Sequence, residues 1–225
     1  MPNFQYGHAN QIPSATQAAA MDINSIFGGF VDRGTWVYHD TLTQAAGASA
    51  LSSYMLFKQP IGSPDQITAV VKTKLQTNLS NSGQFAPPRC LILNQLGFYF
   101  CAPYSTSSKN SGMTVQQDII AMCNSAYFEF VIDNKVFFEG RLEWHPPGIG
   151  ITGFSTNSNE ESWGLGIQSP HAVYNFGNYA KYIAPLQNFG LNIYLPMGSL
   201  PVWSATGNGM NLVVLMKGLT DRSVQ

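Results

Sequence analysis

Residues 126–148, AYFEFVIDNKVFFEGRLEWHPPG, constrain the fold more than any other part of this chain. Two aromatic-rich runs flank Asp133 and Asn134, residue types that favour a turn between antiparallel strands. A two-residue loop would mix polar and apolar side chains on both faces of the hairpin. A three-residue loop, 133–135, makes one face wholly apolar. Because register follows the buried face, the sequence predicts the longer loop, with a left-handed residue near its end.

In that register Phe130 and Phe138 face the core, and Glu129 lies directly across from Glu139 on the other face. Carboxyl groups roughly 5 Å apart are also the separation used by retaining glycosidases. Arg141, diagonal to Glu129, is expected to bridge both carboxylates. A guanidinium favours the charged form of each, whereas a hydrolase needs one carboxyl group protonated. We therefore interpret the hairpin as architecture and not as a catalytic pair.

Other segments also have the pattern of strands. Residues 87–103 form a long apolar run bounded by prolines, and residues 50–62 end in a Pro/Gly break. Residues 188–196 and 209–219 alternate apolar and less apolar side chains, which predicts half-buried strands. Turn residues separate these runs at intervals of about ten to twenty residues, as in a sandwich or jelly roll. The predicted fold class is all-β, a single jelly-roll β-sandwich.

Two regions depart from the strand pattern. Residues 114–124 have a capping box at Thr114 and Gln117 and predict one short helix inside the domain. Residues 1–50 are rich in Ala, Gln, Asn and Gly, and they predict an extended N-terminal arm with a possible short helix starting near Ser14. Residues 51–225 then form the jelly-roll domain. We expect the first 25 or so residues to be ordered by neighbouring subunits.

Composition excludes several classes of function. The chain has 225 residues, only 10% of them charged, and a net charge of −1. No basic field is present to attract nucleic acid, so the folded domain is not expected to bind it specifically. The N-terminus lacks the pattern of a secretory signal, and no apolar run is long enough to span a bilayer. The sequence therefore predicts a protein made in a reducing cytoplasm.

Residues with catalytic or ligand-binding chemistry do not form a recognisable motif. The three cysteines lack metal-ligand spacing and are interpreted as structural. The histidines are scattered, and two adjacent glutamates lie in a polar loop. The sequence thus predicts no catalytic residue, no cofactor, no metal site and no enzymatic activity. The residues considered were Cys90, Cys101, Cys123, His8, His39, His145, His171, Glu160 and Glu161.

Three segments together resemble a known family. Residues 72–100, 184–196 and 212–225 resemble an early strand, a late strand and the closing strand of major capsid proteins of tailless icosahedral bacteriophages with a vertical jelly roll. The hairpin and its exit at 145–153 fit the same pattern. The resemblance covers roughly residues 72–225 and consists of packing and turn patterns without chemistry.

The resemblance implies a structural capsid subunit that self-assembles into an icosahedral shell enclosing DNA. Its implied partners are other copies of itself and other capsid proteins such as a penton or spike. An internal membrane beneath the shell is left open, and the implied location is the virion. The main alternative is a phage spike or carbohydrate-binding β-sandwich, in which Trp144, Trp163 and Trp203 could stack on sugars. A cupin-like enzyme would need a His/Glu cluster at strand spacing, which the sequence does not offer.

Overall fold

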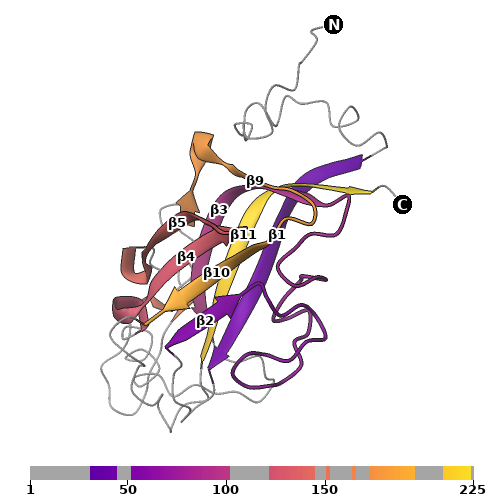
Figure 1. Cartoon of the computed structure of the whole chain (residues 1–225). Helices are drawn as coiled ribbons and strands as arrows, with labels where there is room; N and C mark the ends of the chain where they lie inside the picture. The colour runs from indigo at the N-terminus through magenta and orange to yellow at the C-terminus, as the bar shows by residue number, and fades with distance from the viewer. Residues whose placement is uncertain are drawn as a thin grey trace, which may run out of the picture.

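The computed structural model describes residues 31–44, 52–101, 122–144, 151–152, 164–165, 173–195 and 210–223. The protein is all-β in these ranges, with two antiparallel sheets packed on one core (Figure 1). The strands are β1 (Val31–Gln44), β2 (Ser53–Leu56), β3 (Cys90–Cys101), β4 (Tyr127–Ile132), β5 (Lys135–Arg141), β6 (Ile151–Thr152), β7 (Gly164–Leu165), β8 (Val173–Asn175), β9 (Lys181–Ile183), β10 (Phe189–Tyr194) and β11 (Met210–Ser223). Short 3-10 turns occupy Leu142–Trp144 and Gly177–Tyr179.

The two sheets draw their strands from the whole length of the chain. The first sheet has the order β1-β11-β3-β8, and β9 also pairs with β3. The second sheet has the order β2-β10-β4-β5. In Figure 1, β4, β10 and β2 lie in front of β3, β11 and β1. The short strands β6 and β7 pair with each other.

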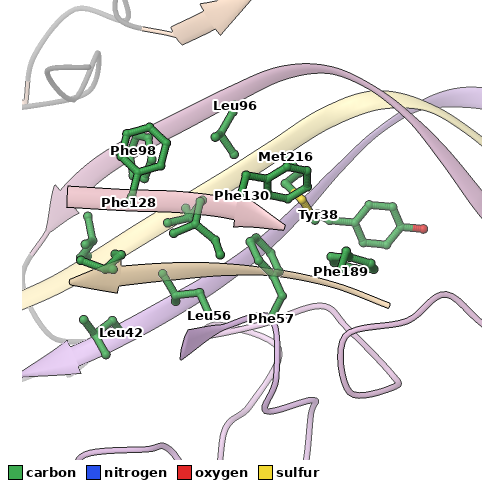
Figure 2. Packing of buried hydrophobic residues seen from close by; sticks show 14 of the residues in the cluster. Tyr38, Leu42, Leu56, Phe57, Leu96, Phe98, Phe128, Phe130, Phe189 and Met216 are labelled. Atoms are coloured by element: carbon green, nitrogen blue, oxygen red, sulfur yellow. The ribbon is translucent and has the colours of Figure 1, made fainter. Parts of the chain in front are cut away.

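One hydrophobic core fills the space between the sheets. The alternation predicted for β10 is confirmed from Leu191 onward, because Leu191 and Ile193 are fully buried in this core. In β11 Val214 is also fully buried in it, but Val213, predicted on the less buried face, is buried as well. Phe98 of β3 and Phe128 of β4 meet across the layers with ring centroids 4.9 Å apart. Figure 2 shows these rings and their neighbours lying between the strands of the two sheets. Burial on this scale is the main stabilising contribution in a sandwich.

The predicted hairpin forms, but its loop differs from the prediction. Ile132 pairs with Lys135, so the loop has two residues, and the left-handed residue is Asp133 at its start. A β-bulge then adds Phe137 to β5, after which Phe130 pairs with Phe138. The bulge restores the predicted pairing beyond it and lets both Phe137 and Phe138 pack against the core. The apolar face was thus predicted correctly beyond the bulge. The three-residue loop was wrong, and Val136, predicted on the apolar face, is exposed.

The first strand lies inside the region predicted to be an arm. Residues 31–44 form β1, which pairs with β11 along its whole length, from Val31 opposite Ser223 to Gln44 opposite Met210. The predicted boundary between residues 50 and 51 therefore falls after the first strand of the sheet. Residues 1–30, with the helix expected near Ser14, lie outside the described residues.

A long connection joins β2 to β3. Residues 57–89, the 57–89 connection, contain no named strand and run beside β1, where Thr77 forms an isolated bridge with Asp40. Of the helix predicted at 114–124, only its last three residues are described, within a helical turn over 122–125. Met122 in that turn is fully buried in the core.

Candidate functional site

The two opposed glutamates lie on the outer face of the second sheet. Glu129 on β4 pairs directly with Glu139 on β5, as predicted, and Asn192 on β10 is its partner on the other side. The phenol of Tyr194 donates a hydrogen bond to Glu129, and the phenol of Tyr127 donates one to Glu139. Partial desolvation and these carboxylates raise the pKa of both tyrosines above its ordinary value.

Arg141 does not take the role that the sequence suggested. Its guanidinium pairs with Glu143 at 2.8 Å, on an exposed part of the surface after β5. The two carboxylates are therefore held by tyrosine hydroxyl groups instead of being bridged by an arginine. Glu139 is exposed and Glu129 half-buried, so this face offers acceptor groups on an open strand surface.

A second cluster of charged residues, unlike the two glutamates, is buried. Sequence reasoning missed it. Lys72 of the 57–89 connection reaches Asp40 of β1 with Nζ 2.7 Å from Oδ1, and Asp65 Oδ2 lies 3.9 Å from the same nitrogen. Asp40 is fully buried, and burial raises the pKa of its carboxyl group while Lys72 opposes that shift. Asp40 is far from Asp65 and Lys72 in the sequence, and the three residues follow no motif, so no local signal could have joined them.

The side chain of Asn78 pairs with the backbone at the edge of β1. Asn78 Oδ1 accepts a hydrogen bond from the backbone N–H of His39 at 2.9 Å, and Asn78 Nδ2 donates to the carbonyl of Val37 at 2.7 Å. The amide group thus takes the place of a neighbouring strand. The ring of His39 contacts the backbone carbonyl of Lys74 at 3.3 Å, which places this histidine in a structural contact between β1 and the 57–89 connection.

The start of β3 carries a polar cluster around Cys90. Its thiol donates to Asp221 Oδ2 at 3.4 Å, and the hydroxyl group of Tyr182 donates to the sulfur. Burial and the charge of Asp221 raise the pKa of Cys90 to about 11. A thiol with so high a pKa is a poor nucleophile at neutral pH, since the thiolate is the reactive form.

Several residues considered from the sequence are not brought into any site by the described structure. Trp144 is 62% exposed just after β5. Cys101 is the last residue of β3, and nothing of its side chain is described. The residues outside the described ranges are His8, His145, His171, Glu160, Glu161, Trp163 and Trp203.

The described residues contain neither a cluster of metal-binding side chains nor a membrane-spanning helix. In these ranges no three His, Cys, Asp or Glu side chains come close enough to hold a metal ion. No helix in the described part of the chain is long and apolar enough to cross a membrane. No protein-family model, no curated protein and no solved structure matches this chain.

Proposed function

We propose that this chain is a single jelly-roll subunit of a self-assembling icosahedral shell that encloses DNA. The pairing of the strands carries the proposal. β1 pairs with β11, β2 with β10, β3 with β8 and β9, and β4 with β5. In sequence order these pairs are nested, so that each pair lies between the two strands of the pair before it. Such nested pairing is what a long hairpin produces when it wraps into two sheets, as in the jelly rolls of viral capsids.

The surface beside β1 supports a role in side-by-side packing. Trp36 and Val37 of β1 are exposed large apolar residues, and so are Val70, Val71 and Leu75 of the 57–89 connection. The hydrogen bonds of Asn78 tie that connection to β1. Exposed apolar side chains gathered on neighbouring elements mark protein contact sites. We propose that this side of the molecule packs against further copies of the chain.

A phage spike or carbohydrate-binding module is the second candidate. The exposed indole of Trp144 favours it, because an aromatic ring open to solvent can stack on a sugar. Jelly rolls serve lectins as well as capsids, so the fold alone does not choose between the two functions. This reading predicts a small oligomer and binding to a glycan array that Trp144→Ala abolishes.

Negative-stain microscopy and light scattering of the purified full chain test the proposal. We expect shells or regular arrays, and we expect the double variant Val71→Asp, Leu75→Asp to stay small while its melting temperature is unchanged. Ser80→Asp, also exposed on the 57–89 connection, is the matched control and should assemble normally. Deleting residues 1–25 should likewise prevent assembly without unfolding the domain. Monomers or trimers over a wide range of salt and protein concentration would overturn the proposal.

A further inference from the structure

The buried charges of Lys72, Asp40 and Asp65 are costly for a protein of this size. The three residues are 3%, 0% and 7% exposed, respectively, and removing charged groups from water carries a desolvation penalty that their mutual attraction has to offset. One amine faces two carboxyl groups, so pairing of opposite charges leaves one carboxyl group without a cation of its own in the cluster. A reaction between amine and carboxyl group would remove two of the three charges.

The geometry places the reacting atoms together. Lys72 Nζ lies 2.7 Å from Asp40 Oδ1, which also accepts the backbone N–H of Thr41 at 3.0 Å. The other oxygen, Asp40 Oδ2, accepts the backbone N–H of Phe57 at 2.6 Å. The carboxyl group is therefore fixed by the backbone on both sides, with the amine against the oxygen that does not contact Phe57.

Asp65 is placed to carry protons. Its Oδ2 lies 3.9 Å from Lys72 Nζ. Its Oδ1 is occupied by the backbone N–H groups of Ile67 and Thr68 and by the hydroxyl of Thr68, which hold the side chain in place. One oxygen thus anchors the residue while the other faces the amine.

From this arrangement we infer that Lys72 and Asp40 join in an intramolecular amide bond, with Asp65 as the proton carrier. The ammonium gives one proton directly to Oδ1 of Asp40, 2.7 Å away, and the free amine attacks Cγ of Asp40. Oδ2 takes the negative charge of the tetrahedral intermediate, where the N–H of Phe57 stabilises it. Asp65 takes the second proton from nitrogen and delivers it to the already protonated Oδ1. The Cγ–Oδ1 bond then breaks, Oδ1 leaves as water, and Oδ2 becomes the carbonyl oxygen of the amide. One ammonium and one carboxylate thus become one amide and one water, without oxidant or reductant.

Two physical effects favour this condensation. Groups held at contact distance in a fixed orientation react as if at a very high concentration of each other. Burial also disfavours the charged carboxylate and raises the pKa of Asp40, although Lys72 and the two N–H groups oppose that shift. The product would fasten the 57–89 connection covalently to β1, beside the surface proposed above for packing between subunits. The inference does not depend on that proposal.

Intact-mass spectrometry of the denatured full chain tests the bond. We expect wild-type protein to weigh one water molecule less than its sequence, whereas Lys72→Met and Asp65→Asn should have their full masses. Asp65→Asn keeps the Oδ1 acceptor for the loop and so removes proton transfer with little effect on folding. Lys74→Met, an exposed lysine on the same connection, is the matched control and should retain the loss of water.

Tryptic mapping locates the bond. An amide at Lys72 blocks cleavage there, so residues 59–74 should be recovered joined to residues 34–58. Full sequence mass in folded wild-type protein, with residues 59–72 released as a free peptide, would overturn the inference. A mass lower by one water molecule in the folded Asp65→Asn variant would overturn the role of Asp65 as proton carrier.

Discussion

Glu129 and Glu139 face each other across β4 and β5, and each accepts a hydrogen bond from a different tyrosine, Tyr194 and Tyr127. Like charges directly opposite each other in a sheet are destabilising. The tyrosine hydroxyl groups offset part of this repulsion, and they do so without an arginine between the carboxylates. Tyrosines in the same sheet therefore stabilise the glutamate pair, which lies on a solvent-accessible face.

Single substitutions in this pair should change stability little. Glu129→Gln and Glu139→Gln each relieve repulsion while weakening one hydrogen bond, so we expect changes of about 0–1 kcal/mol in the free energy of unfolding. Arg141→Met should be equally mild, because Arg141 is exposed and its partner is Glu143. Urea titrations of the three variants at pH 7 measure this. A clearly larger loss for Arg141→Met would mean that Arg141 does bridge Glu129 and Glu139 in solution.

Truncation of the core phenylalanine on the same hairpin should have a far larger effect. Phe130 is fully buried, so Phe130→Ala should cost on the order of 3–5 kcal/mol, from lost burial and the cavity left behind. Phe138 is only partly buried, but it contacts Tyr174 of the other sheet with ring centroids 3.9 Å apart, and we expect a smaller loss for Phe138→Ala. Val136→Ala, at an exposed position of β5, is the control. Thermal and urea melts should rank the three variants in that order.

The parts of the fold that the sequence predicts are those in which alternation is undisturbed. From Leu191 onward β10 alternates buried and half-buried residues, and this pattern can be recognised in the sequence. β1 is different, because Asp40, Thr41 and Gln44 are polar yet buried. The 57–89 connection covers this part of β1 and supplies Lys72 to Asp40. Alternation fails as a signal wherever a distant segment provides the partners of buried polar groups.

The hairpin loop shows a second limit of sequence reasoning. A three-residue loop and a two-residue loop followed by a bulge give the same pairing of Phe130 with Phe138, so the apolar pattern does not distinguish them. The buried cluster of Lys72, Asp40 and Asp65 shows a third limit. Its members come together only once the long connection has folded against β1, and no spacing in the sequence encodes that contact.

Gly218 on β11 is a position where no side chain can be accommodated. A Cβ atom there would lie 2.0 Å from the carbonyl oxygen of Ile92, at the point where the register between β11 and β3 shifts. The clash is with backbone, so Gly218→Ala must displace β3, and we expect a loss of about 1–3 kcal/mol or more. Gly34→Ala on β1 is the matched control, because its Cβ would meet open space. Equal melting temperatures for the two variants would contradict the close approach of β11 and β3.

The thiols of buried Cys90 and half-buried Cys123 should be protected from alkylation until the protein unfolds. Burial and nearby carboxylates raise the pKa of Cys90 to about 11 and that of Cys123 to about 12, from 9.0. At pH 8 iodoacetamide should therefore modify both far more slowly in folded than in urea-unfolded protein, as peptide mass spectrometry can measure site by site. Rapid labelling of either thiol in folded protein at pH 8 would contradict its placement.

The same shifts set the sign of a pH dependence. A pKa raised by folding means that the folded state holds its proton more tightly, so this contribution to stability is complete below about pH 9 and is lost as pH rises toward 11 or 12. Wild-type protein should lose stability between pH 9 and 11 more steeply than Cys90→Ala, because the variant lacks one of the titrating groups. Parallel declines in urea titrations of the two proteins would show that Cys90 holds its proton no more tightly in the folded state than in the unfolded one.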